Sequence, residues 1–289
     1  MVLTAGIEKY YFLFGLALVW IVFATVQDIR KREVANWLNF SLVAFALAYR
    51  AFYSSYSSDW MFFIYGLLGF GLFFGLANLF YYSGIFAGGD AKLLMGLGAV
   101  LPFGSYIDFA LVGGSFVLVL FLVGAVYSLI YSLFLVRRNY PKFAREFRKN
   151  IGNKRNLLLA LLFALAFGFF VYSLFGVDYA LLLFGIFLAS FMFFLLIYAK
   201  SLEVCMIKLV SPNKLTEGDW LVSDVRFNRG IIKKTVHGLS LEDIAKLKKA
   251  GKKVLIKEGI PFVPAFLLAF LIMALFWGVL GFDPASFLI

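Results

Sequence analysis

The chain has 289 residues, of which 63% are hydrophobic and only 15% are charged, and its mean hydropathy is +0.93. Soluble domains have about 45–50% apolar residues with glycine included, so this composition excludes a protein that packs all its apolar side chains in one water-soluble core. The 37 Phe residues lie in long apolar runs rather than in alternation with polar residues, which excludes a transmembrane β-barrel.

Eight apolar stretches are predicted to form helices. A helix needs about 20 apolar residues to cross about 30 Å of hydrocarbon. The stretches lie at residues 10–27, 34–53, 60–82, 89–104, 107–136, 157–176, 180–199 and 260–282. The predicted fold class is therefore an all-α polytopic membrane protein with about eight transmembrane helices.

The basic residues set the predicted orientation. Three Lys or Arg residues follow the first stretch, one follows the third, eight follow the fifth and thirteen follow the seventh, whereas Lys9 and Arg50 fall on the opposite side. Because Lys and Arg concentrate in cytoplasmic loops, these four connections are predicted to be cytoplasmic and both termini to be outside. The net charge of +11 then reflects topology and contact with anionic membrane lipids, and we expect no nucleic acid as a partner.

Residues 201–258 form the one sizeable polar insert, which the sequence predicts to be a small cytoplasmic α+β module. Ser240 to Asp243 have the pattern of a capping box before a short helix. Short apolar-alternating stretches lie at Met206–Val210, Trp220–Val225 and Ile231–Lys234, and turns are predicted at Gly230, Gly238 and Gly251. The predicted domains are a membrane catalytic core at 1–136, a basic loop with two further helices at 137–200, the module at 201–258 and a last helix at 259–289.

Two carboxylates are the strongest catalytic candidates. Asp28 ends the first apolar stretch, and Asp90 begins the fourth after Gly88 and Gly89, so the topology places both at the cytoplasmic face. Two neighbouring carboxylates share a proton, so that one can activate water while the other polarises a peptide carbonyl. Glycines beside such a pair permit unusual backbone conformations and a close approach of a substrate strand.

The same residues also fit roles other than peptide cleavage. The chain has one Cys and one His, so it cannot form an internal disulfide framework or a Cys/His zinc cluster, and we expect no metal and no organic cofactor. The glycine pair also fits a helix-packing contact, and Asp28 fits a solvated interfacial charge. A proton- or cation-coupled transporter that uses Asp28 and Asp90 is an alternative function. A presenilin-like enzyme, with both aspartates deeper in the bilayer, is another.

Two motifs carry a resemblance to a known family. Residues 28–38 (DIRKREVANWL) and 87–99 (AGGDAKLLMGLGA) resemble the type IV prepilin peptidases, which are Gly-x-Gly-Asp membrane aspartic proteases, and most of all their archaeal prepilin and preflagellin branch. The two family aspartates match Asp28 and Asp90. The sequence departs from the family pattern at Ala87, where the motif has Gly, and at Ala35, where Pro is common.

The resemblance implies an activity and a set of site residues. It implies an aspartic endopeptidase with Asp28 and Asp90 as the catalytic pair and no cofactor. Substrates would be precursors with a short basic leader before a hydrophobic helix. Gly88, Gly89 and Asn36 would shape the site, Lys92 would either tune the pair or extend toward the interface, and Glu33 would meet the cations of the leader or pair with Arg30 or Arg32.

Overall fold

The computed structural model describes residues 8–175, 179–227, 230–235 and 238–278. The single His237 and the ends of the chain lie outside this range. The chain divides into two compact units, one made of the residues up to Leu129 together with those from Ile260 onward, and the other of Ile130–Gly259. Each unit is described by itself.

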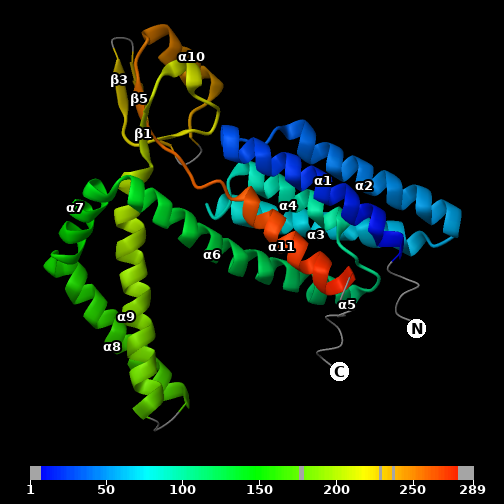
Figure 1. The fold of residues 1–289 in the computed structure, drawn as a ribbon, viewed down its shortest axis with the longest axis horizontal. Coiled ribbons are helices and arrows are strands. Elements are labelled where there is room, and N and C mark those ends of the chain that lie inside the picture. Colours follow the sequence, from blue (N-terminus) through cyan, green and yellow to red (C-terminus); the bar gives the residue numbers. More distant parts are fainter. Residues whose placement is uncertain (1–7, 176–178, 228–229, 236–237, 279–289) are drawn as a thin grey trace. The chain divides into compact units, whose positions relative to one another are not determined.

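The first unit is a bundle of helices that includes the last helix of the chain (Figure 1). The helix α1 packs against α2 and α11, and α4 packs against α2 and α3. The elements are α1 (Glu8–Lys31), α2 (Asn36–Ser57), α3 (Trp60–Tyr82), α4 (Gly88–Val100), α5 (Tyr106–Asp108), a π-helical segment (Phe109–Gly113), α6 (Gly114–Arg138, which continues into the second unit) and α11 (Val263–Gly278).

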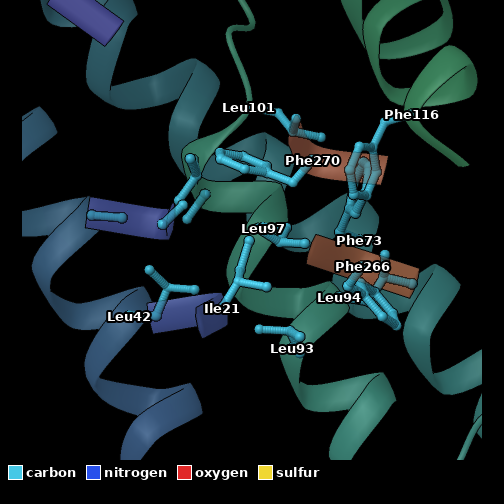
Figure 2. Packing of buried hydrophobic residues seen from close by; sticks show 14 of the residues in the cluster. Ile21, Leu42, Phe73, Leu93, Leu94, Leu97, Leu101, Phe116, Phe266 and Phe270 are labelled. Atoms are coloured by element: carbon cyan, nitrogen blue, oxygen red, sulfur yellow. The ribbon is translucent and has the colours of Figure 1, made fainter. Parts of the chain in front are cut away.

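The helix α4 is enclosed by protein. Nine of its 13 residues are buried, because α2, α3 and α11 surround it. Its close approach to α3 depends on glycine, since a Cβ atom at Gly98 would lie 2.4 Å from Phe73 Cβ and 2.6 Å from the Gly69 carbonyl oxygen. Figure 2 shows Leu94 and Leu97 of α4 among Phe73, Phe266 and Phe270. The centre of the first unit is therefore a short, fully packed helix.

The second unit contains long apolar helices and the small module. Its helices are α7 (Tyr140–Ile151), α8 (Lys154–Phe175), α9 (Tyr179–Leu202) and α10 (Leu241–Ala250). Its strands are β1 (Ile207–Val210), β2 (Trp220–Leu221), β3 (Val225–Phe227), β4 (Gly230–Ile232) and β5 (Val254–Lys257); β5 lies between β1 and β2 in one antiparallel sheet, and β3 pairs with β4 in another.

The predicted module is confirmed as a small region of strands and one helix, with one difference. Ser240 caps α10, and its hydroxyl accepts the N–H of Asp243 at 3.2 Å. Gly230, Gly238 and Gly251 all have positive φ angles. The difference is that the apolar-alternating stretch Trp220–Val225 is not continuous in the structure, because β2 and β3 belong to different sheets and a bend separates them.

All eight predicted apolar stretches contain helices, but only part of the membrane topology is supported. Four described helical segments are long and apolar enough to span a membrane: Glu8–Lys31, Trp60–Tyr82, Tyr106–Arg138 and Leu182–Met206. The helix α4, at about 20 Å, is shorter than a typical span. Exposed aromatic residues lie at both ends of the first bundle (Trp37, Tyr81 and Tyr82 at one end; Tyr56, Trp60 and Tyr106 at the other), as expected at membrane interfaces. The number of eight spans stays a prediction.

Candidate active site

Asp28 lies in the last turn of α1 and is only 7% exposed. The helix ends three residues later, where Arg32 adopts a left-handed conformation (φ 59°) and its N–H donates to the Asp28 carbonyl at 2.9 Å. The Asp28 side chain reaches α11, since its Oδ2 accepts the backbone N–H of Val263 at 3.0 Å. The start of α11 therefore holds this carboxylate.

Asp90 is the third residue of α4 and is 8% exposed. Its Oδ2 accepts the backbone N–H of Ala87 at 3.2 Å, so the side chain closes the first turn of its own helix. The positive end of the helix dipole also favours a carboxylate there. Asp28 and Asp90 are 62 residues apart in sequence, yet α1 and α4, the helices that carry them, contact each other in the bundle.

The glycines before Asp90 do not have the conformation that the sequence suggested. We expected Gly88 and Gly89 to permit an unwound stretch, but both lie in the first turn of α4 and neither has a positive φ angle. A Cβ atom would meet only Tyr81 at 3.8 Å from Gly88 and Val34 at 3.5 Å from Gly89. Both glycines are partly exposed, so they leave open space beside Asp90 instead of a special backbone shape.

The two departures from the family motif are accommodated locally. Ala87 has φ −73° and ψ 164°, an extended conformation that any residue adopts, so glycine is not required there. Ala35 uses the N–H that a proline would lack, because it donates to Gln27 Oε1 at 3.0 Å. This bond ties the α1–α2 loop to α1 just before Asp28.

A hydrogen bond joins the two motifs at the exposed rim of the site. Lys92 Nζ donates to Asn36 Oδ1 at 2.6 Å, which links α4 to the first residue of α2. The structure thus places Lys92 in a contact that neither the tuning role nor the interfacial role had anticipated. Glu33 is exposed in the loop between α1 and α2 and is not part of the buried site.

Arg50 is a residue whose role the sequence did not indicate. Although placed among the few basic residues of the outer side, it is completely buried. Its Nε donates to the Ala99 carbonyl at 2.8 Å, Nη2 to that of Leu101 at 2.7 Å and Nη1 to that of Phe62 at 2.8 Å. Arg50 therefore caps the C-terminus of α4, the end opposite Asp90. An arginine inside an apolar stretch was the available sign of such a role.

Two further polar side chains are buried in the same bundle. Thr25 lies one turn before Asp28, and Asn39 lies one turn after Asn36. Both are buried, and the Thr25 hydroxyl and the Asn39 amide have no hydrogen-bond partner among the residues that the structure describes. Two neighbouring carboxylates can share one proton and polarise water and a carbonyl. Among the described residues, no three His, Cys, Asp or Glu side chains are grouped as metal ligands.

The part of the chain that contains this site is similar in sequence to known proteins. Residues 15–134 match the type IV leader peptidase family. The preflagellin peptidases of Methanocaldococcus jannaschii and Methanococcus maripaludis are each 35% identical over 82 residues, which is 28% of this chain and 35% of each relative. That of Methanococcus voltae is 30% identical over 89 residues, 31% of this chain and 38% of that protein.

These similarities cover only part of each protein, since the matched region spans about a third of the length of the curated relatives. They nevertheless confirm the resemblance inferred from the two motifs. The region of this chain that carries Asp28 and Asp90 matches the type IV leader peptidase family.

Proposed function

We propose that this protein is a membrane aspartic endopeptidase that removes the basic leader from prepilin- or preflagellin-like precursors at the cytoplasmic membrane face. The observation that carries the proposal is that Asp28 and Asp90 are both buried, one at the end of α1 and the other at the start of α4, in helices that contact each other. The match of residues 15–134 to the type IV leader peptidase family supports it.

The chemistry follows from the pair of carboxyl groups. One carboxylate takes a proton from a water molecule, whose oxygen attacks the scissile carbonyl carbon, while the other, protonated carboxyl donates to the carbonyl oxygen. The intermediate then collapses and the C–N bond breaks. The leaving nitrogen takes the proton held by the first carboxyl group, and a hydroxyl proton of the intermediate returns to the second carboxylate. Hydrogen bonds from Ala87 and Val263 hold the two side chains in fixed orientations during these steps.

The surroundings of the pair suit the proposed substrate. The partly exposed Gly88 and Gly89 leave room for an extended peptide beside Asp90. Exposed Glu33 offers a negative charge to a basic leader at the rim. We propose eight spans with both termini outside, which puts Asp28, Asp90 and the module at the cytoplasmic face.

The decisive experiment is cleavage of a model precursor by the inserted protein. Asp28→Asn and Asp90→Asn should each lower the rate by about 10²–10⁴-fold, the usual loss when a general acid or base is removed. The double variant should lose little more, because the two residues act as one unit. Asp59→Asn, at an exposed carboxylate near the opposite end of the bundle, is the matched control. Wild-type cleavage by either single variant would refute the proposal.

The orientation has its own test. With Cys205 replaced by Ala, a cysteine introduced at Lys149 should react with an impermeant thiol reagent only from the cytoplasmic side, and one at Tyr56 only from outside. Both positions are exposed. Reaction of the Lys149 position from outside would reverse the topology and place the aspartates away from a cytoplasmic leader.

A further inference from the structure

The last helix of the chain begins at the first aspartate. Val263 is the first residue of α11, and its N–H donates to Asp28 Oδ2 across 235 residues of sequence. The first N–H groups of a helix have no partner within the helix and need an acceptor. The preceding Ile260, Pro261 and Phe262 have no side-chain oxygen, so α11 cannot be capped locally. Asp28 supplies the missing acceptor.

The contact also resolves an unfavourable placement of Asp28. The carboxylate lies in the last turn of α1, where the negative end of the helix dipole opposes a negative charge. The positive end of α11 meets it there instead. The two helix ends thus fix where the side chain of Asp28 lies.

The donor is held firmly because α11 is anchored in the core. Phe266 and Phe270 are buried, and Figure 2 shows them beside Leu94 and Leu97 of α4. The Phe262 ring fills the space over Gly124, where a Cβ atom would lie 2.4 Å from the ring.

The same turn of α11 reaches the segment that leads to Asp90. The rings of Phe262 and Phe266 lie 5.6 and 5.7 Å from that of Phe86, between centroids. Phe86 directly precedes Ala87, whose N–H binds the Asp90 carboxylate. One helix end therefore contacts Asp28 through its backbone and the approach to Asp90 through its aromatic side chains.

We propose that the first turn of α11, with the Val263 N–H at its centre, is the positioning element of the aspartate pair. This inference rests on the proposed peptidase function. It adds to the site a segment that contributes no polar side chain, and it makes Val263 a positioning residue that acts through Asp28.

The test removes one N–H and little else. Proline fits the first position of a helix and lacks only the donor, so Val263→Pro should leave α11 folded. Its kcat for a model precursor should fall about ten- to a hundredfold, the loss expected for a hydrogen bond to a charged group, while KM stays within about twofold. Val263→Ala keeps the N–H and trims the packing, so its kcat should stay within about threefold of wild type. Equal rates for the proline variant and wild type, or equal losses for both variants, would overturn the inference.

A second measurement does not depend on activity. Asn at position 28 keeps an acceptor oxygen, whereas Ala does not. Amide hydrogen exchange at residues 263–268 should therefore be faster in Asp28→Ala than in wild type and unchanged in Asp28→Asn and in Asp90→Ala. Unchanged exchange in Asp28→Ala would show that the carboxylate does not hold α11. Activity of Asp28→Asn would instead refute the peptidase proposal itself, so the two failures are distinguishable.

Discussion

The two units of the chain bury different kinds of polar groups. Among the described residues, the buried charged side chains are Asp28, Arg50 and Asp90, and all three belong to the first unit. The buried polar side chains of the second unit are uncharged: Ser132, Asn150 and Ser201. Burying a charge costs several kcal/mol unless it is compensated, so a protein retains one only where it has a use.

The apolar side chains of the two units differ in their exposure. The leucines of α4 are fully buried, whereas most described leucines and phenylalanines of α8 and α9 are exposed, as helices that face lipid would be. The comparison teaches that length and hydropathy identify lipid-facing helices, whereas burial identifies α4, the helix that carries the proposed catalytic Asp90. The predictions below test this difference.

The largest effect is expected at Arg50. Arg50→Leu removes three buried hydrogen bonds from a charged group to the carbonyls of Ala99, Leu101 and Phe62. The free energy of unfolding in detergent micelles should fall by about 3–5 kcal/mol. Arg50→Lys should recover only part of this loss, because an ammonium group lacks the planar fork.

A basic residue near the same end of the bundle provides the control. Lys9 pairs with Asp59 at 3.3 Å, and both side chains are partly exposed. Lys9→Met should therefore change stability by no more than about 1 kcal/mol. Equal effects at Lys9 and Arg50 would contradict the view that buried charges hold the first unit together.

The role of Arg50 shows what the sequence could and could not predict. Apolar runs predicted where helices lie, and two short motifs predicted Asp28 and Asp90, because hydrophobicity and local residue order are properties of the chain itself. The partners of Arg50 and Asp28 are backbone groups of Ala99, Leu101 and Val263. Backbone donors and acceptors are the same at every residue, so no sequence pattern marks them.

The glycines are a second example of a feature that the sequence could not predict. Gly88 and Gly89 carry the motif, but the close helix contact is made by Gly98 and Gly69, which no motif distinguishes. Which glycine faces a neighbouring helix depends on the rotation of α3 and α4 about their axes. Hydropathy that is high on all sides of a helix does not encode that rotation.

The next largest loss of stability is expected at the contact of Gly98 in α4 with Gly69 in α3. The Cβ atom of Gly98→Ala would overlap Phe73 Cβ and the Gly69 carbonyl, neither of which can move without shifting α3. The free energy of unfolding should fall by about 1–3 kcal/mol. At Gly168 of α8, a Cβ atom would meet only the side chains of Ile186 and Leu182, so Gly168→Ala should cost less. An equal or larger loss at Gly168 would remove the distinction between the two units.

A smaller effect of opposite sign is expected at Ser54. Its hydroxyl is fully buried in α2 and has no hydrogen-bond partner in the described part of the chain. Ser54→Ala should therefore raise the free energy of unfolding by about 1 kcal/mol. Ser57 of the same helix is exposed and donates to the Tyr53 carbonyl at 2.8 Å, so Ser57→Ala measures the gain in helix propensity together with the loss of one exposed hydrogen bond. Destabilisation by Ser54→Ala beyond the Ser57 control would indicate a bound water at Ser54.

The smallest effect is expected in the module, where a half-buried carboxylate depends on pH. Burial raises the pKa of Asp219 above its ordinary value, the N–H of Thr216 lowers it at 2.8 Å, and the charge of Glu258 raises it further. Because the folded pKa is the higher one, the unfavourable contribution of Asp219 is absent at acid pH and develops as pH rises through the folded pKa. Asp219→Asn keeps an acceptor oxygen for Thr216. It should leave stability unchanged near pH 3 and increase it by less than about 1 kcal/mol at pH 7, since water screens a half-buried group.

The measurement is amide hydrogen exchange in β5 of the full chain, compared between variant and wild type at each pH so that the intrinsic pH dependence of exchange cancels. Asp224→Asn changes the net charge of the module by the same amount at an exposed carboxylate, which accepts the N–H of Lys234 at 2.8 Å. Subtracting its effect isolates the contribution of burial. A pH-independent difference for Asp219→Asn, or an equal difference for Asp224→Asn, would show that the module does not restrain this carboxyl group. Burial of Asp219 would then not lower the stability of the second unit, whereas the first unit contains charges whose burial costs stability unless it is compensated.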